Sequence, residues 1–158
     1  MQKFLLVWAM ILPMTALANS GISAPDVVGD WHCVADSEYH SVKALMRYHA
    51  DGTATEFMEI KEKVNHLPEL EFSIMNYQWQ FKDNKLLMRN PDITYYQYYF
   101  ILPDGGFYKF DDEVNAEGKA LMMESFEENN WHYIEFDGKD KHRYYFENGY
   151  EGHCQRLK

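Results

Sequence analysis

Cys33 and Cys154 are the two cysteines of the chain, one near each end of the expected domain, and they could form either a disulfide or part of a metal site. His32 adjoins the first and His153 adjoins the second, so a metal site is one interpretation. Adjacent residues of a strand point to opposite faces, however, and neither pair has the spacing of a zinc motif. The sequence therefore favours a disulfide between the two cysteines.

Residue patterns of known enzymes are missing from the chain. It contains no G-x-S-x-G nucleophile elbow, no P-loop and no H-E-x-x-H. If the cysteines are joined, no thiol is left for covalent catalysis. The 25 Asp and Glu residues could supply an acid–base pair, but acids on a small domain are mostly solvated surface. We therefore expect a protein that binds rather than catalyses, with no cofactor and no metal.

Asp111, Asp112 and Glu113 form the most acidic short stretch. Together with Asn115 and Glu117, they could bind calcium through oxygen ligands, although Ala116 stands where an EF-hand frame needs Gly. The same three acids could instead contact a basic protein. This second interpretation predicts an inhibitor or immunity protein that captures a lysozyme-like enzyme or a toxin.

Aromatic side chains are the strongest remaining signal, at 16% of the chain. They could line a pocket for a small apolar ligand, form an interface patch, or simply pack a barrel. For the pocket interpretation, the predicted ligand-binding residues are Trp79, Tyr96, Tyr98 and Trp131.

Composition restricts the class of protein. The 158 residues suit one domain, and 46% apolar residues with many aromatics exclude a disordered chain. A formal net charge of -10 argues against nucleic-acid binding, which needs a basic surface. We expect a monomer.

Residues 1–18 have the three regions of a secretory signal peptide. Lys3 precedes an apolar run, and Ala16 and Ala18 supply small residues at the cleavage positions. Asn19 follows where a lipoprotein would carry Cys, so we expect no lipid anchor and a periplasmic or secreted protein. The remaining chain divides into a flexible lead, residues 19–28, and a single β-barrel-like domain, residues 29–158.

Short runs of aromatic and β-branched residues alternate with turn dipeptides after residue 28, which predicts about ten strands in hairpin order. The predicted strands are 29–35, 42–48, 53–64, 70–82, 85–88, 95–102, 107–110, 119–126, 131–136, 142–146 and 152–156. Residues 90–92 are expected to turn, and residues 111–118 to form the longest loop. The alternation changes parity within 70–82, which predicts a β-bulge near Met75 and Asn76. The expected fold is all-β, an antiparallel meander barrel or sandwich.

Gly29, Asp30 and Trp31 at the start of the first strand resemble the Gly-x-Trp opening of lipocalins and the wider calycin group. The resemblance implies that Trp31 packs across the barrel floor against a basic residue near the last strand. Arg156 stands at the corresponding place, with Arg143 as a second candidate. The second lipocalin motif, Thr-Asp-Tyr, is absent. The resemblance also implies a lipocalin-like carrier of a small apolar ligand inside the barrel.

Overall fold

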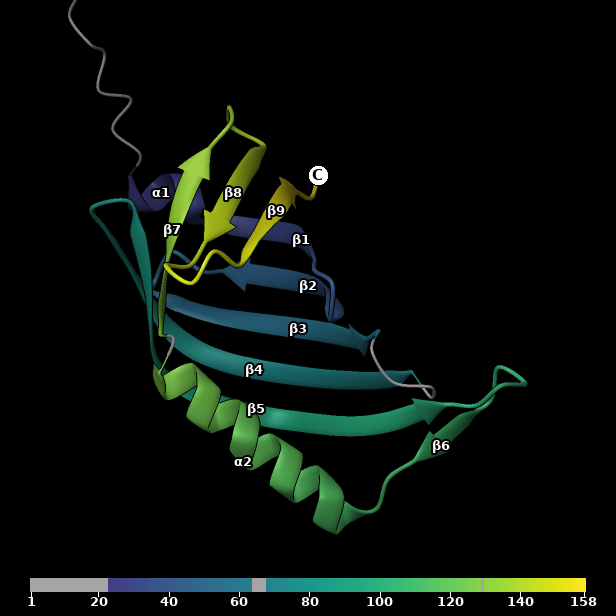
Figure 1. The fold of residues 1–158 in the computed structure, drawn as a ribbon. Coiled ribbons are helices and arrows are strands. Elements are labelled where there is room, and N and C mark those ends of the chain that lie inside the picture. Colours follow the sequence, from purple (N-terminus) through teal and green to yellow (C-terminus); the bar gives the residue numbers. More distant parts are fainter. Residues whose placement is uncertain (1–22, 64–67, 129) are drawn as a thin grey trace, which may run out of the picture.

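A single antiparallel sheet curls round and closes on itself to form a barrel (Figure 1). The computed structural model describes residues 23–63, 68–128 and 130–158, so the predicted signal peptide lies outside the described residues. The elements are α1 (Ala24–Val27), β1 (Gly29–Asp36), β2 (His40–Tyr48), β3 (Thr53–Glu62), β4 (Glu69–Lys82), β5 (Lys85–Ile101), β6 (Phe107–Lys109), α2 (Asp112–Glu128), β7 (Trp131–Phe136), β8 (Lys141–Tyr145) and β9 (Glu151–Arg156).

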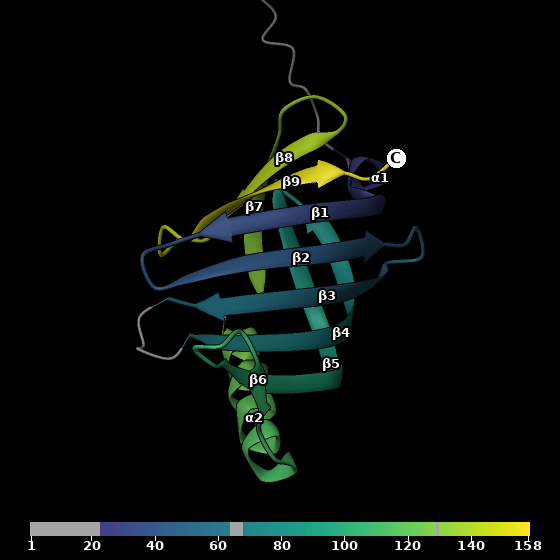
Figure 2. The same cartoon turned by 90° about the vertical axis from the view of Figure 1, so that its right-hand side faces the viewer.

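Eight of these strands form the closed barrel, in the order β4-β3-β2-β1-β9-β8-β7-β5, with β5 returning to pair with β4. The ninth, β6, is an extra strand on the far end of β5. Figure 2 shows β1 to β5 side by side, with β7 behind them. The predicted all-β antiparallel fold is confirmed, and it is a barrel.

Strand β5 is longer than predicted because it continues through Asn90 and Pro91, where the sequence analysis expected a turn. Its pairing with β4 shifts register opposite Met75 and again opposite Tyr77. The pairing of β4 with β3 is continuous, so the extra residues belong to β5 and not to β4. The predicted β-bulge near Met75 and Asn76 is therefore present beside these residues, but the additional residues lie on β5 and not on β4.

The floor of the barrel is built around Trp31, which is fully buried. The guanidinium carbon of Arg156 lies 4.1 Å from the centre of the indole, and the Trp31 Nε1–H donates to the carbonyl of Val27 at 2.8 Å. Gly29 has a φ of +133°, and a Cβ there would lie 2.4 Å from an Arg156 nitrogen. These contacts hold α1, which lies within the segment that the sequence analysis treated as a flexible lead.

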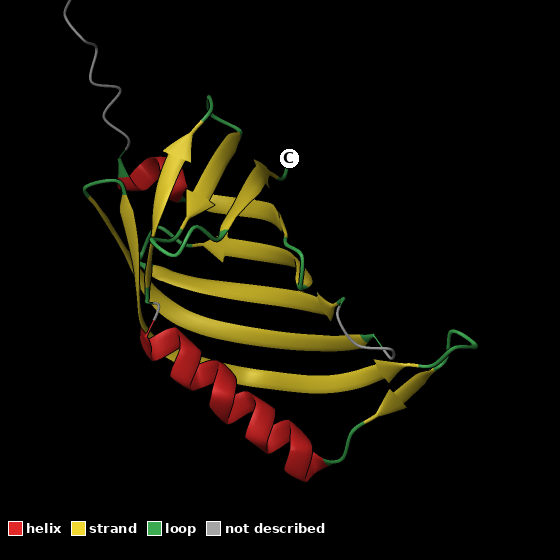
Figure 3. Cartoon of the chain, viewed as in Figure 1, coloured by secondary structure: helices red, strands yellow, loops and turns green. Residues whose placement is uncertain are grey.

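Helix α2 corrects the largest error of the sequence analysis, which placed a loop at residues 111–118 and a strand at 119–126. The helix starts where the Asp111 carboxylate accepts the N–H of Val114 at 3.1 Å. Asp112 and Glu113 follow in the first turn, where negative charge favours the helix dipole. In Figure 3 the helix runs along β5. No helix in the described parts of the chain is long and apolar enough to cross a membrane.

The predicted disulfide joins Cys33 and Cys154, which face each other across the β1–β9 pair with Cα atoms 4.0 Å apart. The bond links positions 121 residues apart. His32 and His153 alternate with the cysteines and lie on the outer face, as strand geometry requires. A disulfide is typical of an oxidising, non-cytoplasmic compartment.

Removing the disulfide, by reduction or as Cys33→Ala/Cys154→Ala, should lower the free energy of unfolding by a few kcal/mol. The chain-entropy model gives about 4–5 kcal/mol as the upper figure for a loop of this length. Urea denaturation with and without reductant measures the loss. The double variant is its own control, because reductant should not change its stability. An unchanged unfolding midpoint on reduction of the native chain would contradict the prediction.

Candidate ligand-binding cavity

A cavity of about 700 Å³ lies between the inner face of the barrel and α2. It exists because several inward positions carry small or unbranched side chains where an eight-stranded barrel needs bulk to fill its interior. On β2 the inward residues are Val42, Ala44 and Met46, and on β3 Met58 and Ile60 face them. The wall is therefore mainly apolar and, through its methionines, adaptable in shape.

Helix α2 forms the wall on the side where the strands separate. β5 pairs with β7 only between Lys85 and Leu87, so the rest of β5 has no hydrogen-bonded contact with β7. The helix faces the cavity with residues at helical spacing: Val114, Gly118, Leu121, Met122, Ser125 and Phe126. Gly118 is required for this fit, because a Cβ there would lie 2.5 Å from the Tyr96 hydroxyl.

Two carboxyl groups reach the cavity from neighbouring strands. Glu56 is 7% exposed, and burial raises its pKa from the ordinary 4.5 to about 7, although a hydrogen bond from Tyr77 opposes the rise. Burial also raises the pKa of Glu71, which accepts a hydrogen bond from Tyr96. Oε1 of Glu71 is buried without a hydrogen-bond partner. Both acids are therefore under-satisfied relative to carboxylates in water.

Two histidines reach the cavity from the opposite wall, His132 on β7 and His142 on β8. Burial lowers the pKa of His132 to about 3 and that of His142 to about 4. A backbone hydrogen bond at Arg143 opposes the lowering in His142, and the charge of Arg156 adds to it. Both histidines are therefore neutral at physiological pH. In the described part of the chain, Nδ1 of His132 lacks a hydrogen-bond partner and the ring nitrogens of His142 meet none with good geometry. These nitrogens are free to bond a polar group inside the cavity.

Among the described residues, one group has the composition of a metal site: Cys33, Cys154 and His142, with donor atoms within 4.8 Å of one another. The sulfur atoms are bonded to each other, so they cannot act as thiolate ligands in this state. Asn115, one of the oxygen ligands in the calcium interpretation, is buried, and its side-chain oxygen accepts the N–H of Tyr98. Its amide nitrogen donates to the carbonyls of Phe110 and Asp111, so its side chain has a structural role in holding the start of α2.

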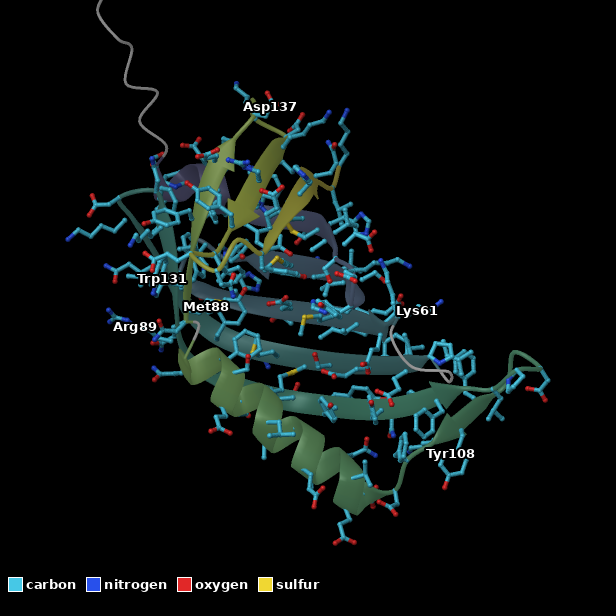
Figure 4. The ribbon with its side chains drawn as sticks, viewed as in Figure 1. Lys61, Met88, Arg89, Tyr108, Trp131 and Asp137 are labelled. Carbon is cyan, nitrogen blue, oxygen red and sulfur yellow. A yellow bond between two sulfur atoms is a disulfide. The ribbon has the colours of Figure 1, made fainter. Side chains whose placement is uncertain are left out.

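The four aromatic residues predicted to bind a ligand divide into two pairs. Tyr96 and Tyr98 line the cavity. Trp79 packs in the core against Tyr48 and donates its Nε1–H to a backbone carbonyl at 3.0 Å. Trp131 lies at the β5–β7 junction, far from Tyr108 in Figure 4, with the Lys85 ammonium 4.0 Å from its ring centre. Neither tryptophan is among the lining residues, and a binding role for any of the four stays a prediction.

The acids proposed for a basic partner lie together at the start of α2. Asp111, Asp112 and Glu113 are all exposed. Asp111 also caps the helix, so its side chain has a structural role. Arg143, the second candidate for the floor contact, instead lies on the outer surface and bonds Glu135 at 2.7 Å.

Sequence reasoning missed the buried acids and histidines of the cavity. A usable signal existed for Glu56, which has the same parity in its strand as Met58 and Ile60. His132 likewise has the same parity in its strand as the buried Ile134. A charged residue that shares parity with an apolar stripe should point into the barrel. The residues from α2 could not be found this way, because the segment was assigned to the wrong element.

Comparison with known proteins gives no relative: no family model matches the chain, and no curated protein matches it. The resemblance of Gly29 and Trp31 to the lipocalin opening therefore stays a prediction. The floor contact between Trp31 and Arg156 is a property of this structure in its own right.

Glu56→Gln should change how stability depends on pH. Between pH 4.5 and about 7 the folded chain keeps a proton on Glu56 that the unfolded chain has lost, so stability falls as pH rises. At 1.36 kcal/mol per pKa unit, the native chain should lose roughly 3 kcal/mol relative to the variant. Urea denaturation of both proteins at pH 5 and pH 8 measures this difference.

The buried histidines have the opposite effect, because their lowered pKa values make stability rise with pH below about 6.5. They are present in both proteins, so their contribution cancels in the comparison. Glu59→Gln, on the outer face of β3 beside Lys43, is the matched control. A difference between native chain and Glu56→Gln that does not vary with pH would contradict the assignment.

Proposed function

We propose that this chain is a non-enzymatic binding protein that takes up a small, mainly apolar ligand inside its barrel, in the manner of lipocalins. The observation that carries the proposal is the cavity of about 700 Å³. Its size falls within the roughly 300–1,000 Å³ range of small-molecule sites, and its lining is mostly apolar with a few polar groups.

The proposal extends to the compartment. A disulfide that joins the two ends of the domain requires oxidising conditions to form. The signal-peptide pattern of residues 1–18 agrees with export. We therefore place the protein in the periplasm or outside the cell, where a carrier would meet an apolar molecule that needs shielding from water.

Capture of a basic protein is the second candidate. The observation that favours it is the exposed group Asp111, Asp112 and Glu113 on a chain of net charge -10. Such a contact would weaken as salt rises, because exposed charges act through screened attraction. The cavity has no part in this function, so the two candidates can be separated by substitutions in one place or the other.

Met58→Trp should fill part of the cavity and weaken binding of the apolar fluorophore N-phenyl-1-naphthylamine by about tenfold or more, a loss of about 1.4 kcal/mol. Met58 lines the cavity from β3. The matched control is Leu45→Trp, which places the same ring at an exposed position on the outer face of β2. Probe fluorescence measures both affinities, and circular dichroism checks that both variants fold.

Equal affinity of the two variants would contradict binding inside the barrel. Asp112→Asn/Glu113→Gln gives the complementary test, because these exposed acids carry the same charge without capping α2. It should leave probe binding unchanged if the chain is a carrier, and should abolish salt-sensitive capture of a basic protein such as lysozyme if the chain is an inhibitor.

A further inference from the structure

The charged side chains that line the cavity are all acidic. Three glutamates belong to its lining, Glu56, Glu71 and Glu117, and within the described residues no Lys or Arg does. Arg156, at the floor, stacks on Trp31 and donates to backbone carbonyls, so it is not part of the wall. A ligand carboxylate would therefore meet buried acids and no cation.

The strand register fixes where the two buried acids lie. Glu56 pairs with Met75, and Glu71 lies four residues before Met75 on the same face of β4. At about 3.4 Å per residue, the backbone positions of the two acids lie at levels roughly 14 Å apart along the barrel wall. The inward position between them on β3 is Met58, so apolar surface separates two acidic positions.

The free-energy cost of burying these acids favours a positively charged group as their partner. A buried carboxylate without a positive partner is costly, and removing that cost requires either protonation or a cation. Oε1 of Glu71 has no hydrogen-bond partner, and Glu56 is bonded only by a neutral hydroxyl among the described contacts. Tyr96 and Tyr98 on β5 and Tyr144 on the opposite wall also line the cavity, and aromatic rings attract cations to their faces.

On this basis we propose that the cavity selects ligands with a positively charged amine on an apolar or aromatic body, and rejects apolar carboxylates such as fatty acids. The ammonium group pairs with Glu56 or Glu71, and the apolar body lies along the methionines and α2. The neutral histidines of the opposite wall can bond a second polar group of the ligand. This inference rests on the proposed function.

Decylamine, decanol and decanoate test the inference, because they share one chain and differ in charge at pH 7.5. Isothermal titration calorimetry should show decylammonium binding at least about tenfold more tightly than decanol, and decanoate more weakly than decanol. Glu56→Gln/Glu71→Gln should bring the affinity for decylammonium down to that for decanol. Its affinity for decanol should stay unchanged, which also shows that the variant folds.

The control is Asp112→Asn/Glu113→Gln, which removes the same formal charge from the exposed start of α2 and should keep the preference for the amine. Binding of decanoate as tight as decylammonium would overturn the inference while leaving the proposed function intact. So would a preference for the amine that survives in the Glu56/Glu71 variant. If none of the three probes binds, the proposed function fails and this inference fails with it.

Discussion

Closure of the barrel depends on how β5 is shared among its neighbours. The strand pairs with β4 from end to end but with β7 over only three positions, and its far end pairs with β6 instead. An eight-stranded barrel has an interior that side chains can fill or that can hold one small ligand. Because β5 leaves β7 so early, the barrel wall is incomplete on that side, and α2 covers it. The helical wall of the cavity and the position of Tyr96 against Gly118 follow from this constraint, and the small inward side chains of the strands add to the space.

The opposite end of the molecule is fixed by contacts of a different kind. Trp31, Arg156 and the disulfide tie the first strand to the last, so the barrel closes through both backbone pairing and side chains. The contacts at the floor stabilise the closed barrel. The side covered by α2 provides the space into which the polar groups of the cavity point.

Burying two acids and two histidines without full partners lowers stability, and a chain selected for stability alone would replace them with apolar residues. Their common location explains why they are tolerated. All four face the cavity, and His142 also packs against Trp31, with ring centres 4.5 Å apart. Groups that violate local rules at one place are typical of a functional site.

Much of this architecture could be predicted from sequence because it depends on alternation and turn residues, which act locally. The disulfide, the outward histidines beside it and nearly all the barrel strands follow from parity. Helix α2 could not, because Gly118 weakens its helical pattern, and the close contact of Gly118 with Tyr96 joins segments that are distant in the sequence. The residues that line the cavity could not be predicted from sequence patterns either. Whether Trp79 fills the core or lines a pocket depends on packing against Tyr48, which no pattern within β4 reveals.

The central claim is that apolar molecules bind inside the barrel, and methyl NMR with ε-¹³C-methionine tests it most directly. With decanol as a neutral probe, we expect nuclear Overhauser contacts from the alkyl chain to the methyl groups of Met58 on β3 and Met122 on α2, which both line the cavity. Saturating decanol with no such contacts, or contacts limited to groups on the outer surface, would contradict it.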